Sequence, residues 1–444
     1  MSDDAAVPVA PDATPRTVGE LLERRLRQLG VMRVYGQALG RLVHVPVEDP
    51  ELAVLLADAD GRLAHHDGSG RLGAALLQGP ILHLSSQPGG TAPLQTVSDP
   101  TELVQVLADP PGMLVPGASA IHLDLDLEAP VPDDLVLDVA PERAPVMTLD
   151  PTMAELDLII VVGPGVVRAS AVDDLSSLAR KMGVGVLNTW GAKGVERWDS
   201  PFHFGTAGLQ ARDFELAGLG SADVVIAVGL DPDESPLDSL GSWVVQEVPP
   251  TQLPALAHNW TPSRRLPTRP ALYETIATVV NPMYESDAVP LSAPRASLHL
   301  SGALPDRGVV AADAGPAGFW IARTFPTSVP GSVCVPATPI QGFAAAAALV
   351  CRLESRPCVA VSDQIGGLDG LDDTSAAVLE LAESLDAPVA LQLWGPEGHL
   401  DSSTAHVELL TAELATDVVR IDDVPVRTDD VAAIEAAAGP LVAW

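Results

Sequence analysis

Lysine, cysteine and aromatic residues are scarce in this chain of 444 residues. Only two lysines occur, Lys181 and Lys193, and 59 acidic residues against 25 basic ones give a formal net charge of -34. Because nucleic acids and anionic membrane surfaces are bound by clustered Lys and Arg, this balance argues against both as partners. We interpret the acidity as a solvated surface that keeps the protein soluble.

The three cysteines, Cys334, Cys351 and Cys358, have no CxxC spacing, so the sequence predicts neither a zinc site nor a disulfide framework. A reducing, cytoplasmic location fits this usage. Residues 1–16 are polar and rich in Pro and Ala, and we expect a disordered leader there. No stretch reaches the roughly 18 uncharged apolar residues of a membrane span.

Apolar residues make up 47% of the chain but aromatics only 4%, so Ala, Val and Leu must fill the interior. That composition suits parallel strands covered by Ala-rich helices. With roughly 150 residues per domain, the length predicts about three domains. We therefore expect an α/β protein with three doubly wound parallel-sheet domains.

The predicted elements fall into three groups with a Pro-rich segment between the last two. Residues 17–140 form the first, with helices at 17–30 and 50–62 and strands at 31–35, 79–85 and 120–127. Residues 150–248 form the second, with strands at 156–163, 183–189 and 222–229 and a helix at 170–182. Residues 249–294 are predicted to be a surface linker.

The third group, residues 295–444, has predicted strands at 308–312, 357–361 and 388–393 and helices at 342–352 and 374–385. Residues 418–421 and 440–443 are expected to complete its sheet. The helix at 342–352 is so rich in alanine that we expect it to be buried.

Few motifs point to chemistry. Gly163-Pro164-Gly165 lies between a strand and a helix, so it is either a phosphate-binding turn or a tight structural turn. Asp363 follows a strand and is either a metal ligand or a turn cap. The run at 366–373 carries Asp369, Asp372 and Asp373, as a cation loop or a solvated turn. HExxH, GxSxG and Walker A patterns are lacking.

In order along the chain, several segments resemble the thiamine-diphosphate-dependent enzymes of the acetolactate synthase and 2-oxoacid decarboxylase group. The strongest are LDLIIVVGPGVV, MGVGVLNTWGAKGV, DSPFHFGTAGL and SADVVIAVGLDPDES in the central group. ELAVLLADADGR and AIHLDLDLEAPVPDD match the family's pyrimidine domain, and VVAADAG and PIQGFAAAAALV its diphosphate domain. The resemblance implies those three domains.

The chain departs from the family where the cofactor is activated. In the family, a Glu of the pyrimidine domain protonates the aminopyrimidine ring of the cofactor. Aligned through Ala53, Ala57, Asp58 and Arg62, this position falls on Pro50. Glu48 and Glu51 are close by, but a slip of one residue at a helix start turns a side chain by about 100°. The catalytic residues are therefore unknown.

The second departure concerns the metal. Family members have Gly-Asp-Gly after a strand and an Asn roughly 27 residues later, which together hold Mg²⁺ on the diphosphate. Here the motif reads Ser362-Asp363-Gln364, and the Asn position falls on Gly395 or Pro396. The resemblance leaves Asp363 as the metal ligand and Asp363, Gly342, Gly163 and Gly165 as cofactor-binding residues.

Two functions follow from this resemblance and its departures. The first is a divergent acetolactate-synthase-like protein without normal cofactor activation, acting as a binding, regulatory or structural homologue. The alternative is an active thiamine-diphosphate- and Mg²⁺-dependent 2-oxoacid decarboxylase or carboligase with relocated catalytic groups. In both cases we expect a homodimer or homotetramer, or pairing with an active paralogue. The Ala-rich stretch 343–350 is then both core and interface.

Overall fold

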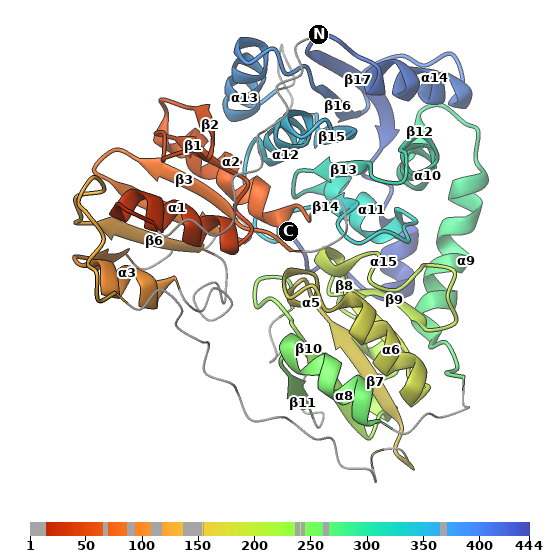
Figure 1. Cartoon of the computed structure of the whole chain (residues 1–444). Helices are drawn as coiled ribbons and strands as arrows, with labels where there is room; N and C mark the ends of the chain where they lie inside the picture. Colours follow the sequence, from red (N-terminus) through yellow and green to blue (C-terminus); the bar gives the residue numbers. More distant parts are fainter. Residues whose placement is uncertain are drawn as a thin grey trace.

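The computed structural model describes residues 15–64, 70–86, 94–107, 118–135, 153, 155–235, 240, 245–260, 266–364 and 371–444. Three sheets organise these residues into three domains (Figure 1). Most of the predicted leader and the connection at 136–152 lie outside the described residues. None of the described helices is long and apolar enough to cross a membrane.

The N-terminal domain is a six-stranded sheet in the order β2-β1-β3-β4-β6-β5. A connection of three residues joins β3 to β4, and a link this short allows only antiparallel pairing, so β4 runs against both of its neighbours. The other strand pairs are parallel. Its elements are α1 (Val18–Gln28), β1 (Arg33–Gly36), β2 (Val43–Pro46), α2 (Pro50–Arg62), β3 (Gly73–Leu77), β4 (Ile81–Ser85), β5 (Leu94–Val97), α3 (Pro100–Val106) and β6 (Ala118–Leu123).

The central domain is a five-stranded parallel sheet in the order β11-β10-β7-β8-β9. Its strands β7, β8, β9 and β10 are almost wholly buried, as continuous apolar runs such as LIIVV predict, whereas the edge strand β11 is largely half-buried or exposed. The strands are β7 (Leu158–Val162), β8 (Val186–Thr189), β9 (His203–Ala207), β10 (Val224–Val228) and β11 (Val245–Val248). The helices are α5 (Gly165–Arg168), α6 (Val172–Met182), α7 (Asp213–Leu216) and α8 (Leu253–Asn259), with short turns η2 (Trp190–Ala192), η3 (Leu219–Ser221) and η5 (Pro250–Gln252).

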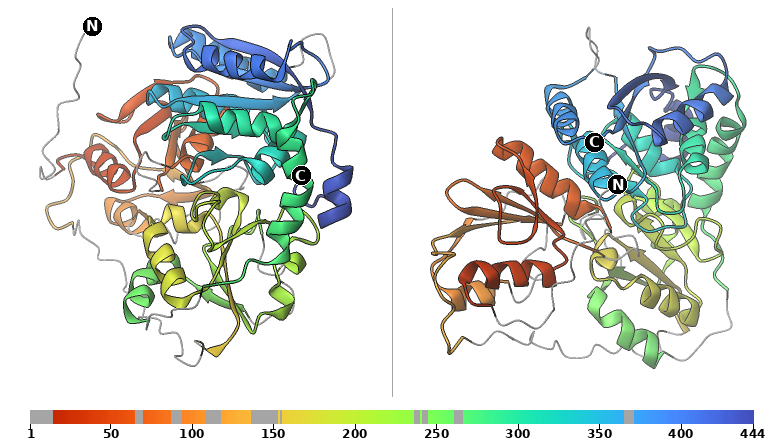
Figure 2. Two further views of the ribbon diagram at one scale, coloured as in Figure 1. Left: turned by 90° about the vertical axis from the view of Figure 1, so that its right-hand side faces the viewer. Right: turned by 45° about the horizontal axis from the view of Figure 1, so that its top comes forward.

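The C-terminal domain is a six-stranded parallel sheet in the order β12-β17-β16-β15-β13-β14, with helices on both faces (Figure 2). Its strands are β12 (Leu291–Ser292), β13 (Val309–Ala312), β14 (Val333–Cys334), β15 (Cys358–Asp363), β16 (Ala390–Gly395) and β17 (Arg420–Arg427). Its helices are α9 (Ala271–Glu285), α10 (Ala293–Ala303), α11 (Pro316–Thr324), α12 (Phe343–Leu353), α13 (Asp373–Ser384), α14 (Ser403–Leu414) and α15 (Ala432–Ala438). The predicted three-domain α/β fold is confirmed, with β4 as an antiparallel exception.

The described part of the segment 249–294, predicted as a linker, contains the helices α8 and α9. In this segment α8 packs on α6, and α9 packs on α10 and α15. Leu256 of α8 and Val280 of α9 are buried. Pro254 lies in the first turn of α8 and Pro270 precedes α9, where a missing N–H group has no helical partner to lose, whereas Pro282 lies inside α9.

The last residues of the chain do not join the sheet of the C-terminal domain, contrary to the prediction for 440–443. Pro440 accepts a hydrogen bond from the backbone of Ala211, and Val442 donates one to Leu209, both in the central domain. The ring of Trp444 meets that of Trp190 edge-on at 5.2 Å between centroids. The C-terminal tail therefore ties the third domain to the second.

The Ala-rich helix α12 is buried as predicted, with exposure of at most 2% from Phe343 to Val350. Part of its cover is α2, which comes from the N-terminal domain of the same chain (Figure 1). Within a single chain this stretch is therefore core, and none of it remains for a second subunit.

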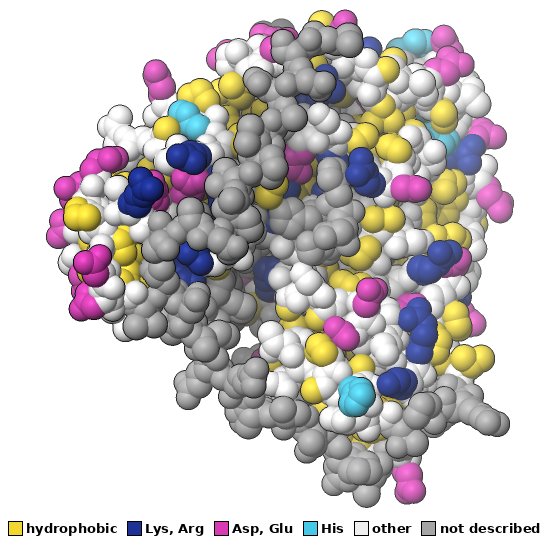
Figure 3. All heavy atoms as spheres, viewed as in Figure 1, with side chains coloured by type: hydrophobic (Ala, Val, Ile, Leu, Met, Phe, Trp, Pro, Cys, Tyr) yellow, Lys and Arg dark blue, Asp and Glu magenta, His cyan; other side chains and the backbone are white. Residues whose placement is uncertain are grey.

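On the face drawn in Figure 3, basic side chains are scattered among acidic ones.

Candidate functional site

The helix α2 begins at Pro50, the position where the family resemblance expects the catalytic Glu. Asp49 caps the helix by accepting a hydrogen bond from the backbone N–H of Glu51 at 2.8 Å. The side chain of Pro50 has no proton to give. Glu48 and Glu51 are exposed to solvent, so each carboxylate lies in water rather than in a closed site.

Two buried arginines fix α2 beside α12. Arg71 pairs with Asp60 at 2.8 Å and with Glu354, and Arg33 pairs with Glu354 at 3.1 Å. Asp60 lies near the end of α2 and Glu354 directly follows α12. The C-terminal ends of α2 and α12 are therefore held close together.

Two carboxylates end neighbouring strands at the carboxyl edge of the C-terminal sheet. Asp313 follows β13 and accepts a hydrogen bond from the N–H of Ala344 in α12 at 2.8 Å. Asp363 ends β15 and accepts one from the N–H of Ala317 in α11 at 2.9 Å. Burial raises the pKa of each carboxyl group to about 6, and the charge of Asp313 adds to the effect on Asp363.

The first-turn amides of α11 and α12 are the groups that bind phosphate in many α/β proteins. Here the protein's own carboxylates accept from Ala317 and Ala344. Gly342, the residue before α12, is also covered, since a side chain there would meet Thr374 at 2.8 Å. An anion approaching these helix ends therefore meets two carboxylates and a packed turn.

The position of the expected second metal ligand is also filled. Gly395 ends β16 beside the side chain of Gln364 and has no room for a Cβ atom. The Gln364 amide accepts a hydrogen bond from the N–H of Glu397 and donates one to Asp423, each at 3.0 Å. A glutamine side chain thus takes the space in which the family resemblance places an asparagine.

The acidic run at 366–373 is described only in part. Asp369 lies outside the described residues, and Asp372 caps α13 by accepting from the N–H of Ser375 at 2.8 Å. Among the described residues, no three His, Cys, Asp or Glu side chains are grouped so as to hold a metal ion. Beside Asp363, the Gln364 amide is already bonded to Glu397 and Asp423, and Gly395 offers no side chain to a metal ion.

In the central domain, Gly163 and Gly165 form the turn between β7 and α5. The N–H of Gly165 donates to the carbonyl of Gly229 at 2.9 Å, and a Cβ atom on Gly163 would lie 2.5 Å from that same oxygen. Both glycines allow two turns to touch at the carboxyl edge of the sheet. The contacts favour a tight structural turn here.

Doubly wound sheets bind nucleotides at the carboxyl edge where the strand order reverses, which in this sheet lies between β7 and β10. Beside the glycine turn, ionic side chains fill this place. Arg62 of α2 pairs with Glu234, and Asp231 pairs with Arg168. Glu234 also accepts hydrogen bonds from Thr189 at 2.6 Å and from the N–H of Gly191 at 3.1 Å. Because Arg62 also donates to the carbonyl of Val335 at 3.2 Å, all three domains meet at this point.

Several residues of these networks are not marked by any sequence pattern. Asp313 had the same signal as Asp363, an acid directly after a buried strand, and was detectable. Arg62 and Glu234 are 172 residues apart, and no local pattern links them. Lys193 was noticed only for its rarity. Burial, with the charge of Arg323, lowers the pKa of its amine to about 7, and the amine lies 3.5 Å from the Thr206 hydroxyl.

Comparison with known proteins supports the resemblance at the level of the fold. Residues 155–249 match the family model of the thiamine pyrophosphate enzyme, central domain. No curated protein matches the chain in sequence. Among solved structures, the X-ray structure of a proposed thiamin diphosphate-dependent enzyme from Mycobacterium smegmatis has a TM-score of 0.61 and 17% identity. The match covers 93% of this chain and 100% of that chain. The chain thus has the three-domain fold of thiamine-diphosphate enzymes.

Proposed function

We propose that this chain is a divergent relative of the acetolactate synthase group that keeps the fold as a binding or regulatory protein and does not activate thiamine diphosphate. One observation carries the proposal. Asp313 and Asp363 accept hydrogen bonds from the first turns of α12 and α11, so the protein itself supplies the anions at these helix ends. The Ala344 and Ala317 amides are therefore already bonded to carboxylates of the protein.

Electrostatics supports this assignment. With pKa values of about 6, Asp313 and Asp363 are both largely ionised at pH 7. At an effective dielectric constant of about 20, two like charges about 4 Å apart repel by roughly 4 kcal/mol. A diphosphate of about three negative charges next to these carboxylates is therefore strongly disfavoured unless cations accompany it.

The proton chemistry points the same way. Activation of the cofactor in the family needs an acid at the start of the helix that corresponds to α2. Pro50 stands there and cannot act as one. Loss of a general acid or base alone typically slows a reaction by about 10² to 10⁴. We therefore propose that the fold is retained for protein contacts.

The alternative function is an active 2-oxoacid decarboxylase or carboligase with relocated groups. Glu48 and Glu51 favour it, because both carboxylates lie next to Pro50 at the start of α2, where the family resemblance places the catalytic Glu. For either function we propose a homodimer or homotetramer, or a pair with an active paralogue. Sedimentation of the purified chain as a monomer would exclude self-association.

Turnover distinguishes the two functions. The purified chain is incubated with thiamine diphosphate, Mg²⁺ and a panel of 2-oxoacids, and release of CO₂ is followed. We expect no release above the level without protein. Release that depends on both thiamine diphosphate and protein, and that falls in Glu51→Gln or Glu48→Gln, would establish the enzyme instead.

A further inference from the structure

The three cysteines of the chain come together in the C-terminal domain. Cys334 ends β14, Cys351 lies in the last turn of α12, and Cys358 begins β15. Cys334 and Cys351 are buried, whereas Cys358 is partly exposed. All three are free thiols. Their spacing in the sequence, without a CxxC pattern, gave no sign of this grouping.

A tight turn brings Cys358 back against Cys351. The carbonyl oxygen of Cys351 accepts hydrogen bonds from the N–H groups of Glu354 at 3.0 Å and of Arg356 at 2.9 Å. Ser355, between them, has a positive φ of 54°, which reverses the chain direction. The strand β15 then starts next to the end of α12, and the Cys351 and Cys358 side chains are hydrogen-bonded to each other.

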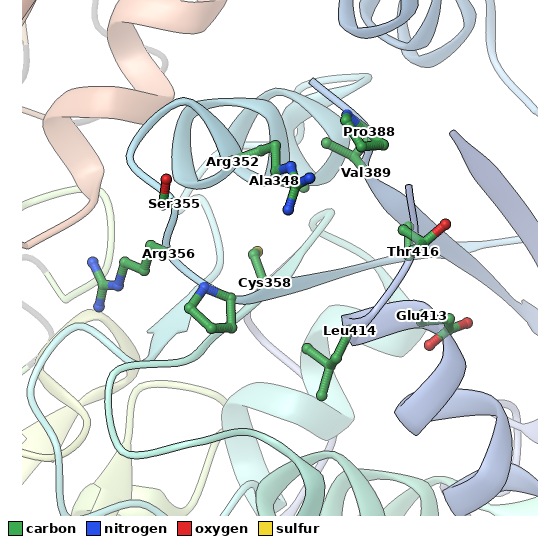
Figure 4. A pocket seen from close by; sticks show the side chains of 12 residues that line it. Ala348, Arg352, Ser355, Arg356, Cys358, Pro388, Val389, Glu413, Leu414 and Thr416 are labelled. Carbon is green, nitrogen blue, oxygen red and sulfur yellow. The ribbon is translucent and has the colours of Figure 1, made fainter. Parts of the chain in front are cut away.

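A cavity of about 110 Å³ gives solvent a route to this pair. Its wall includes Cys358, and Figure 4 shows that side chain pointing towards the helix that carries Ala348 and Arg352. A molecule the size of water needs about 10 to 15 Å³ of such space. A hydroperoxide as small as hydrogen peroxide therefore has room beside the Cys358 sulfur. Cys334 and Cys351 are not part of the wall.

We propose that Cys351 and Cys358 form an oxidant-sensitive dithiol, in which a small hydroperoxide enters through this cavity and converts the two thiols to a disulfide. In the first step the Cys358 sulfur attacks one peroxide oxygen and the O–O bond breaks. Water departs, and Cys358 becomes a sulfenic acid. In the second, the Cys351 sulfur displaces the sulfenic hydroxyl, which departs as a second water with the remaining thiol proton. The sulfurs lose two electrons and the peroxide gains them.

The surroundings of the pair favour this chemistry over that of the third cysteine. The hydrogen bond from Cys358 lowers the pKa of Cys351, and the nearby Arg356 and Arg71 guanidinium groups act in the same direction. The same contact with Cys351, together with burial, raises the pKa of Cys358, so the negative charge of the pair lies on Cys351. The Cys351 thiolate can take the proton of Cys358 as the Cys358 sulfur attacks at the cavity. Burial raises the pKa of Cys334 to about 12, so its thiolate is disfavoured.

The test uses the full-length reduced protein, exposed while folded to a small excess of hydrogen peroxide. Free thiols are then blocked under denaturing conditions and the chain is mapped as peptides by mass spectrometry. We expect one thiol to remain, at Cys334, and one bond between Cys351 and Cys358. Cys334→Ser is the matched control, and it is expected to form the same bond.

Cys351→Ser should leave Cys358 as a sulfenic acid that a dimedone probe captures, and Cys358→Ser should leave Cys351 unlabelled. Because the unmodified protein already gives a decisive map, the test does not depend on the folding of either variant. Three intact thiols after treatment, or a bond that includes Cys334, would overturn the proposal.

Discussion

Replacement of Arg323 by methionine is expected to lower the free energy of unfolding by about 3 to 5 kcal/mol, because it leaves a buried charge without its partner. Arg323 lies on α11 and donates two hydrogen bonds of 2.8 Å to Asp213 in the central domain. The two side chains are 2% and 0% exposed. Arg323 also donates to the carbonyl of Thr206 at 2.7 Å, so one side chain links the two domains at three points.

Urea unfolding measures this effect, and Arg197→Met is the matched control. Arg197 pairs with Asp199 at 2.9 Å, but the two side chains are 63% and 45% exposed. Exposed pairs of this kind contribute little, because water screens the two charges. Equal losses in the two variants would contradict the role assigned to burial. The double variant Arg323→Met with Asp213→Asn should recover part of the loss, because no uncompensated carboxylate then remains.

Replacement of Asp363 by asparagine is expected to stabilise the protein by about 1 to 3 kcal/mol at pH 7.5. Burial raises the pKa of Asp363 from 3.8 to about 6, so the folded protein holds this proton more tightly than the unfolded chain. The stability that this proton contributes is fully present below about pH 4 and is lost as the pH rises through about 6. Asparagine has no charge to lose, and its oxygen still accepts from Ala317.

The measurement is the free energy of unfolding in urea at several pH values between 4 and 7.5. The advantage of Asp363→Asn should grow across that interval, with Glu397→Gln as a control because Glu397 is exposed near the same edge. If Asp363→Asn is instead the less stable protein at pH 7.5, a cation or another partner holds this carboxylate, and the electrostatic argument for an anion-repelling edge fails.

Much of the fold was predictable because strong local patterns and tertiary packing agree. The helix α2 has an Asp cap, a proline in its first turn and a small-residue face, and it spans residues 50–62 as expected. The prediction of a linker at 249–294 was wrong because a proline at a helix start and a proline in a linker look alike in sequence. The prediction that residues 440–443 complete the C-terminal sheet was wrong because a short apolar run does not indicate which domain it will join.

The candidate site was predictable only in part. The end of a buried strand marked Asp363, and the structure brings it next to Asp313 at the same edge. What the edge contains besides these acids depends on distant partners. The fit of Gln364 beside Gly395 and the pairing of Arg62 with Glu234 join residues from separate elements. Such pairs are set by how the domains pack, which no local pattern records.

Asp363 and Asp313 occupy the first-turn amides of Ala317 and Ala344, and we expect them to keep thiamine diphosphate away from these helix ends. Calorimetric titration of the purified chain with thiamine diphosphate in the presence of Mg²⁺ tests this expectation most directly. We predict no saturable binding up to about 1 mM ligand, which corresponds to a binding free energy weaker than about -4 kcal/mol. Micromolar binding that disappears when Mg²⁺ is chelated would show that these carboxylates do not exclude the cofactor.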